Sequence, residues 1–497
     1  MSFGQGEKPK LSFICKNYLQ IYIENGIFVQ MENFSRRLRL VLPLSFAWFI
    51  IWIIATANNP FFWDTVLTSK IAQYFYENGF GNLIVPIDLD AGHPPFFQIY
   101  LSILWKLFGK SLLVSHLAML PFVLLLVWSF YKISLFFFKT EKQIWMSMFF
   151  LCIESTLLAQ STLVSYDVAM VAGFLFGLYS ILYKKRDWLY WVLILLALLS
   201  VRSVVSMACL FFIDFYFRWK EEKFNLSGFI FPYFIGGLVL FAWHFYHYSI
   251  SGWAIFSPSS EWSDQRQVAT LQTIVKNILV IVRNVLDNGR FVFWIINAFF
   301  ILIFLFNKNK INNYKSNIYI ILTIVLVLHI LFFIPFTNPI GHRYLMPIYL
   351  IGILVFVSSV FELKKWKIAL FFGAFNYILG HFIVYPIPIS NGWDSSLAYL
   401  NGIKMQESIR QEIEDNKTNP NDIFTKFPLA FSEKELYLYG DTAHFETKNL
   451  DKVKYVINSN ISNDFQEFEY NYINKNFKLI KTFKSNLIFY NLYEKID

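Results

Sequence analysis

The sequence predicts an all-α polytopic membrane protein that ends in a small α/β domain, and three observations support this fold class. Of the 497 residues, 56% are hydrophobic and 15% are charged, against about 25% charged in a typical soluble domain. Apolar runs long enough to span a bilayer recur along residues 40–390. From Asn391 onward the composition becomes polar and mixed, so residues 391–497 are expected to form a separate domain.

Charge and cysteine usage exclude two other classes of protein. The formal net charge of +9 would suit a nucleic-acid-binding protein, but the basic residues cluster in short loops between apolar runs. Cytoplasmic loops of membrane proteins show this distribution. The three cysteines are scattered along the chain, which favours neither a disulfide framework nor a structural metal site. No nucleic-acid partner and no required cofactor are therefore expected.

The N-terminal segment, residues 1–39, is predicted to be cytoplasmic. It is too polar and aromatic for a cleaved signal peptide, and Arg36, Arg37 and Arg39 precede the first apolar span, Leu40–Ala57. Because positive charge stays on the inner side, the polar segment that follows, Asn58–Pro95, is placed outside.

Two short helices are expected next, and neither is assigned as a span. Thr65–Asn78 carries apolar residues at helical spacing and is followed by Gly79, which indicates an interfacial helix. Pro95–Phe108 is also short and is compatible with a span or with a second interfacial helix. Loop charge favours the interfacial helix, because Leu112–Phe138 can then run inward to Lys139 and Lys142.

The remaining spans alternate in direction and bring the total to about eleven, which places the C-terminus outside. They are Ile144–Ser161, Val168–Tyr183, Trp188–Ser200, Val204–Phe217, Phe229–Tyr248, Phe291–Phe306, Ile318–Phe336, Tyr344–Phe361 and Ile368–Tyr385. A long outer loop, Ser249–Arg290, contains the amphipathic stretch Val268–Leu286.

The C-terminal domain is predicted to combine one helix with four strands on the extracytoplasmic side. Ser395–Asn416 has helical apolar spacing. Runs rich in Ile, Val, Phe and Tyr indicate strands at Asp422–Phe427, Lys452–Asn458, Phe477–Phe483 and Leu487–Leu492.

This topology gathers a set of polar residues at the outer face of the helices. They are Asp64, Asp88, Asp90, His93, Tyr166, Asp167, Arg202, His342, Arg343 and Asp394. Ionisable groups at the edge of a membrane bundle cost free energy unless they are paired or functional. Carboxylates can take a proton from an attacking hydroxyl or amine, while Arg and His can hold a phosphate leaving group.

Four motifs in this order resemble the membrane glycosyltransferases with the GT-C fold, especially the group of protein O-mannosyltransferases and the aminoarabinose transferase of lipid A. The motifs are Asp64 in the first outer loop, His93-Pro94-Pro95 with Leu107-Phe108-Gly109, Ser165-Tyr166-Asp167, and His342-Arg343-Tyr344-Leu345-Met346-Pro347. The resemblance covers about Leu40 to Tyr385.

The resemblance implies a polyprenyl-phosphate sugar donor and an inverting transfer on the extracytoplasmic side. It assigns Asp64 as the catalytic general base and Asp167 as a second catalytic-site carboxylate, which orients the acceptor or the donor. It also places His93 and Arg202 at the donor phosphate, and His342 and Arg343 are further candidates for that contact. Tyr166, Glu154 and Asp394 are further candidates for substrate binding. Asp64 is followed by Thr65 rather than a second acid, which argues against a protein-mannosyltransferase acceptor.

Each candidate also has a purely structural interpretation. Asp64 and Asp167 open helices and would suit N-caps; His93 would suit a turn, and Arg202 a membrane anchor. The pair His342-Arg343 would also suit an interfacial anchor with Tyr344. Glu154 either pairs with a neighbouring helix or lines the cavity. A divalent cation between Asp64 and Asp167 is compatible with the sequence, but the sequence does not require one.

A transporter or flippase of lipid-linked sugars is the rival function. Such proteins usually contain paired halves and helices broken near the midplane, and no such pairing is visible in this sequence. Glu154, which lies inside a predicted span, is the main feature in favour of this alternative. Either function belongs in a prokaryotic cytoplasmic membrane, with a lipid, glycan or protein acceptor in the case of a transferase.

Overall fold

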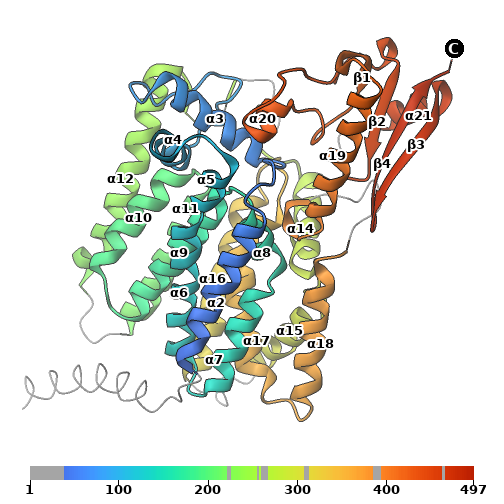
Figure 1. The fold of residues 1–497 in the computed structure, drawn as a ribbon. Helices are drawn as coiled ribbons and strands as arrows, with labels where there is room; N and C mark the ends of the chain where they lie inside the picture. Colours follow the sequence, from blue (N-terminus) through green and yellow to red (C-terminus); the bar gives the residue numbers. More distant parts are fainter. Residues whose placement is uncertain are drawn as a thin grey trace, which may run out of the picture.

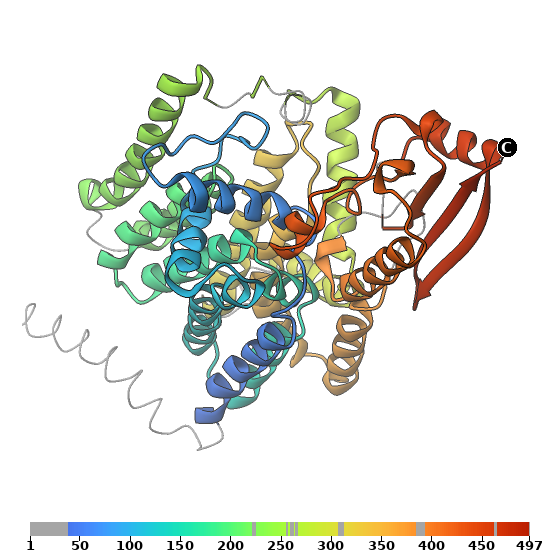
Figure 2. The same cartoon turned by 45° about the horizontal axis from the view of Figure 1, so that its top comes forward.

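The computed structural model describes residues 38–220, 225–254, 257–258, 263, 267–306, 313–383, 393–461 and 465–496. They form a helical body with a smaller, sheet-containing domain at one end (Figures 1 and 2). The N-terminal segment 1–37, with Arg36 and Arg37, lies outside the described residues, and so does the predicted end of the last span at residues 384–385.

The helical body consists of helices that follow the predicted apolar runs closely. Its helices are α2 (Leu38–Ala55), α3 (Thr65–Asn78), α4 (Phe96–Phe108), α5 (Leu112–Leu117), α6 (Leu120–Phe137), α7 (Glu141–Cys152), α8 (Ser155–Thr162), α9 (Tyr166–Leu182), α10 (Asp187–Leu199), α11 (Ser203–Trp219), α12 (Leu226–Ser251), α14 (Leu271–Leu286), α15 (Phe291–Phe306), α16 (Asn313–Phe333), the 3-10 helix η3 (His342–Leu345), α17 (Met346–Val360) and α18 (Trp366–Gly380).

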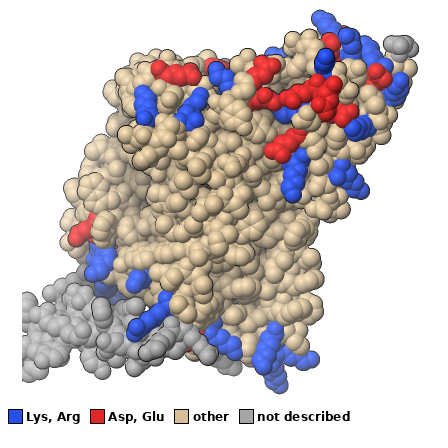
Figure 3. Space-filling view, viewed as in Figure 1, with Lys and Arg blue, Asp and Glu red and all other residues tan. Residues whose placement is uncertain are grey.

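The described helices support a multi-pass membrane protein, while the count of eleven spans stays a prediction. Five of them are long and apolar enough to cross a membrane, or up to seven if each of two bent pairs counts as one span. Four further apolar helices have only 10–17 residues: α4, α9, α10 and α18. Figure 3 shows charged side chains gathered at the two ends of the visible face, with a broad belt between them that carries few. This distribution is expected where hydrocarbon surrounds the belt.

The predicted span Ile144–Ser161 is not one continuous helix, because the chain bends by 54° between α7 and α8. Glu154, which has an extended backbone, causes this break by capping α8: its carboxylate accepts a hydrogen bond from the amide of Leu157 at 2.6 Å. The same carboxylate forms a fully buried ion pair with Arg290. Of the two sequence interpretations of Glu154, the structure therefore shows the pairing with a neighbouring helix.

The amphipathic helix α14 turns its polar face inward and its apolar face outward. Asn277 donates hydrogen bonds to the carbonyls of Ile334 and Phe336, and Asn284 donates to the carbonyl of Ile340 at 2.7 Å. These amides satisfy backbone groups that have no helical partner. The exposed face is apolar: Leu271, Val275, Ile278, Leu279 and Val282.

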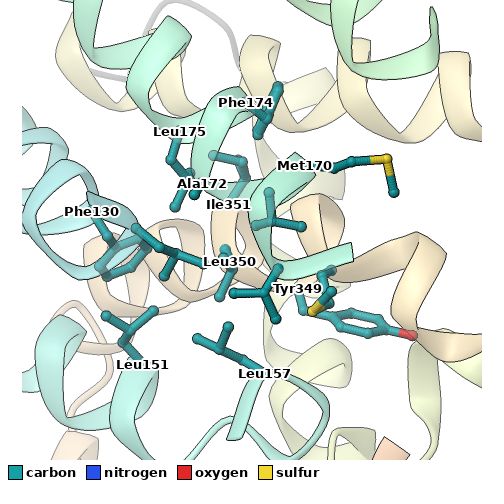
Figure 4. Packing of buried hydrophobic residues seen from close by; sticks show 14 of the residues in the cluster. Phe130, Leu151, Leu157, Met170, Ala172, Phe174, Leu175, Tyr349, Leu350 and Ile351 are labelled. Carbon is teal, nitrogen blue, oxygen red and sulfur yellow. The ribbon is translucent and has the colours of Figure 1, made fainter. Parts of the chain in front are cut away.

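Helix α17 forms the centre of the body, and η3 precedes it at the end that contacts the C-terminal domain. Every residue from Met346 to Val360 is buried, and the side chains pack against α6, α7 and α9 in the core drawn in Figure 4. Because α17 is enclosed by other helices, Arg343, one turn before it, is anchored on a rigid element.

The C-terminal domain confirms the predicted mixture of helix and strand. It contains η4 (Trp393–Ser395), α19 (Tyr399–Asp415), β1 (Ile423–Phe424), α20 (Glu433–Tyr437), β2 (Tyr455–Ser459), α21 (Glu467–Asn476), β3 (Phe477–Ser485) and β4 (Ile488–Lys495). The sheet has the order β1-β2-β4-β3, with β1 parallel to β2 and the other pairs antiparallel. Helices α20 and α21 were not predicted from the sequence.

Candidate functional site

The loop before α3 presents Asp64 to solvent at the end of the body that contacts the C-terminal domain. Phe61 and Phe62 are buried and anchor the loop, and Trp63 has a left-handed backbone with φ of 56°. Asp64 occupies the N-cap position of α3, but its side chain makes no capping hydrogen bond. The side chain is 55% exposed and pairs with Arg343. The carboxylate is thus open to solvent on one side and held by a cation on the other.

The second acid, Asp167, lies in the first turn of α9 and is 3% exposed. Asp167 is not the N-cap residue that the structural interpretation predicts. Ser165 is the N-cap, and the Ser165 hydroxyl accepts the hydrogen bond from the amide of Asp167. The side chain of Asp167 is therefore available to the two arginines that face it.

Arg202 reaches Asp167 from the turn between α10 and α11. Its Nη1 lies 3.1 Å from Asp167 Oδ1, and its Nη2 donates to the hydroxyl of Tyr166 at 2.7 Å. The guanidinium also lies over the ring of Tyr344, 4.2 Å from its centroid. A membrane anchor would extend toward headgroups, whereas this side chain is held among aromatic and acidic groups.

Arg343 lies at the centre of the cluster and contacts three carboxylates. Its Nε is 3.1 Å from Asp167 Oδ2, its Nη2 pairs with Asp64, and its Nη1 pairs with Asp394. Asp394 belongs to η4, at the start of the C-terminal domain. Residues from four distant parts of the chain therefore meet at one guanidinium.

A small cavity of about 30 Å³ opens beside this cluster. Its lining combines the charged side chains of Asp167, Arg202 and Arg343 with apolar and weakly polar ones: Met170, Val171, Val205, Ser206, His329, Phe333, Tyr344 and Pro347. Among the described residues, the buried atoms Asp167 Oδ1, Arg202 Nη1 and Arg343 Nε have ion-pair neighbours but no partner in hydrogen-bond geometry. Two arginine donors with unmet hydrogen-bonding capacity can bind an oxyanion at this position.

His93 borders the cluster but does not line the cavity. It is half-buried, its Nδ1 lies 3.5 Å from the hydroxyl of Ser200, and its ring centroid is 6.4 Å from that of Tyr166. Tyr166 connects it to Arg202 through the hydrogen bond described above.

Two of the candidate residues, His342 and Glu154, do not line the cavity. His342 is buried and its Nε2 lies 3.0 Å from Asp287 Oδ2, in the turn between α14 and α15. Glu154 pairs with Arg290, whose Nη1 donates to the carbonyl of Asp287 at 3.2 Å. These groups form one buried network, which is joined to the cluster through the neighbouring residues His342 and Arg343 of η3.

Sequence analysis missed several residues that shape the site. Tyr344 stacks on Arg202, and its hydroxyl accepts from Arg343 Nη2 at 3.3 Å; its place next to Arg343 was the available signal. Gln160 on α8 donates to Asp394 at 3.0 Å, and Arg290 neutralises Glu154. Nothing in the sequence around Gln160 or Arg290 marks either residue.

The position between Asp64 and Asp167 is taken by the guanidinium of Arg343 rather than left open for a cation. Within the described ranges, no group of three or more His, Cys, Asp or Glu side chains is arranged to hold a metal ion. A divalent cation at this position would have to displace Arg343.

Comparison of the sequence with protein-family models and with curated proteins finds no match. The structure is similar to the crystal structure of ArnT from Cupriavidus metallidurans bound to undecaprenyl phosphate. The TM-score is 0.51 at 10% sequence identity, and the match covers 90% of this chain and 97% of that chain. This similarity confirms the fold that the resemblance predicts, across 90% of the chain.

Proposed function

We propose that this protein is an integral-membrane glycosyltransferase that moves a sugar from a polyprenyl-phosphate carrier to an acceptor outside the cytoplasmic membrane. The observation that carries the proposal is that Asp167, Arg202 and Arg343 line one cavity together with apolar side chains, while Arg343 also pairs with the exposed Asp64. Undecaprenyl phosphate, the lipid bound to ArnT, combines a phosphate with a hydrocarbon chain, and these two parts would match the arginines and the apolar side chains of the cavity. The proposed orientation places the N-terminus in the cytoplasm and the C-terminal domain outside.

In the proposed step, Asp64 acts as the general base. Its exposed carboxylate takes the proton of an acceptor hydroxyl or amine, and the freed lone pair attacks the anomeric carbon of the sugar. The bond from that carbon to the phosphate oxygen breaks, and its electron pair leaves with the polyprenyl phosphate. Attack from the side opposite the phosphate inverts the configuration. The acceptor is a lipid, a glycan or a protein.

The arginines stabilise the leaving phosphate. Both arginines line the cavity, and Arg202 Nη1 and Arg343 Nε have no partner in hydrogen-bond geometry, so the two guanidinium groups can bind charge that develops there during departure. Asp167 keeps the two guanidinium groups at a fixed spacing, since each lies 3.1 Å from one of its oxygens. We assign His93 and Tyr166 to the edge of the phosphate site and His342 to support through Asp287.

A reconstitution experiment tests this proposal against the rival transporter. Proteoliposomes would contain the purified protein, a polyprenyl-phosphate sugar extract and an envelope extract as the source of acceptor. Mass spectrometry would follow both free polyprenyl phosphate and donor movement. A transferase releases polyprenyl phosphate; movement of intact donor across the bilayer without release would establish the transporter instead.

A further inference from the structure

We propose that Asp394 is a positioning residue for the transfer, through which the C-terminal domain completes the active site. Asp394 would act by holding the guanidinium of Arg343 between Asp64 and Asp167. This inference rests on the proposed function and gives the C-terminal domain a defined role in it.

The carboxylate of Asp394 is placed by a buried seam between η4 and α8. Gln160 Nε2 donates to the backbone carbonyl of Asp394 at 2.9 Å and to its carboxylate at 3.0 Å. The next carbonyl, that of Ser395, accepts from the hydroxyl of Thr156 at 3.2 Å. Asp394 is 4% exposed and Ser395 is fully buried. The position of this acid is therefore built into the core of the protein.

Asp394 contacts Arg343 rather than the cavity. It pairs with Arg343 Nη1, and it is not among the residues that line the cavity. A guanidinium presents its donors in a fixed planar fork, so a carboxylate on Nη1 restricts how the other two nitrogens point. Those two nitrogens face Asp167 and Asp64. This arrangement favours a positioning role over the substrate contact expected from the sequence.

The same domain also fixes the loop that carries Asp64. The amide of Phe61 donates to the carbonyl of Leu436 in α20 at 2.9 Å, and Lys70 Nζ lies 2.9 Å from Glu435. The ring of Trp63 packs edge-on against Phe427, with centroids 4.5 Å apart. A left-handed backbone at a tryptophan persists only where its surroundings impose it, and Phe427 supplies such a contact. The C-terminal domain thus holds both partners of the Arg343–Asp64 pair.

A double-mutant cycle tests whether Asp394 acts through Arg343. Asp394→Asn preserves the size of the side chain and removes its charge, so we expect kcat to fall about 10- to 100-fold. In the Arg343→Lys background, where the planar fork is gone, the same substitution should change kcat by less than about 3-fold. Gln160→Ala, which releases Asp394 from α8, should show the same dependence on Arg343.

The matched control is Glu412→Gln, which removes the charge of a carboxylate that pairs with Lys481 within the C-terminal domain. Its kcat should stay within about 2-fold of the wild type, because neither residue lines the cavity or contacts Arg343. Thermal unfolding of every variant in the same detergent separates misfolding from loss of catalysis.

The two proposals fail in different ways. Wild-type protein that turns over no donor contradicts the proposed function. If the wild type is active and kcat is unchanged in both Asp394→Asn and Gln160→Ala, the positioning role is wrong. It is also wrong if Asp394→Asn lowers kcat equally in the wild-type and the Arg343→Lys backgrounds.

Discussion

Replacement of Asp64 by asparagine should abolish most of the transfer activity while leaving the fold intact. A general base contributes about 10²- to 10⁴-fold to a rate, which corresponds to about 3–5 kcal/mol of activation free energy. The structure predicts a much smaller effect on folding. The Asp64 side chain is half-exposed and makes no capping bond, and Arg343 keeps two other carboxylates when Asp64 is neutral. The expected loss of unfolding free energy is below about 1 kcal/mol.

The assay compares this variant with Asp88→Asn in the same proteoliposomes. Asp88 is an exposed acid of the same outer loop, so its replacement controls for loop charge. Release of polyprenyl phosphate gives the rate, and intrinsic fluorescence gives the unfolding temperature. Activity of Asp64→Asn within about 3-fold of the wild type would refute the assignment of Asp64 as the base. If Asp88→Asn lost as much activity, the loss in Asp64→Asn would be explained by the charge of the loop alone.

Four further predictions follow from the contacts described above. Arg202→Lys should raise the donor KM about 10-fold or more, because lysine lacks the fork that reaches Asp167 and a phosphate together; titration of the donor measures this. Glu154→Ala should lower the unfolding free energy by about 3–5 kcal/mol, since it leaves Arg290 buried without a counter-charge; a thermal shift no larger than that of a surface variant would contradict it. Gly289→Ala should prevent stable folding, because a Cβ there would lie 1.9 Å from the carbonyl oxygen of Asn376 at a φ of +80°, whereas Gly237→Ala meets nothing within 4 Å and should be tolerated; size-exclusion chromatography of both variants distinguishes them. Chelation with EDTA should leave turnover unchanged within about 2-fold, because a guanidinium already bridges the two acids; restoration of a lost activity by added Mg²⁺ or Mn²⁺ would contradict this.

The apolar runs were sufficient to predict the helical body and its fold class, because hydrocarbon imposes the same length and composition on every span. They could not predict where a helix breaks. The bend at Glu154 arises from a carboxylate that caps α8 and is neutralised by Arg290, which follows 136 positions later. No local pattern connects those two residues.

The residues that form the cluster were predicted better than the contacts among them. Asp64, Asp167, Arg202 and Arg343 were all identified from residue type and outer placement. The central place of Arg343, the supporting place of His342 and the contact from Asp394 depend on tertiary packing of α17, α14 and η4. The orientation of α14 also depends on tertiary contacts. Its apolar face is exposed because its buried asparagines donate to carbonyls of the loop before η3. Amphipathicity predicted the helix but not which side faces the protein.

A structure of the protein in lipid nanodiscs with polyprenyl phosphate tests the account most directly. We expect the phosphate within hydrogen-bonding distance of Arg202 and Arg343, with the first isoprene units along Met170, Val205 and Phe333. A phosphate bound at another place, with none in the cavity beside Asp167, in a preparation that turns over donor would contradict it.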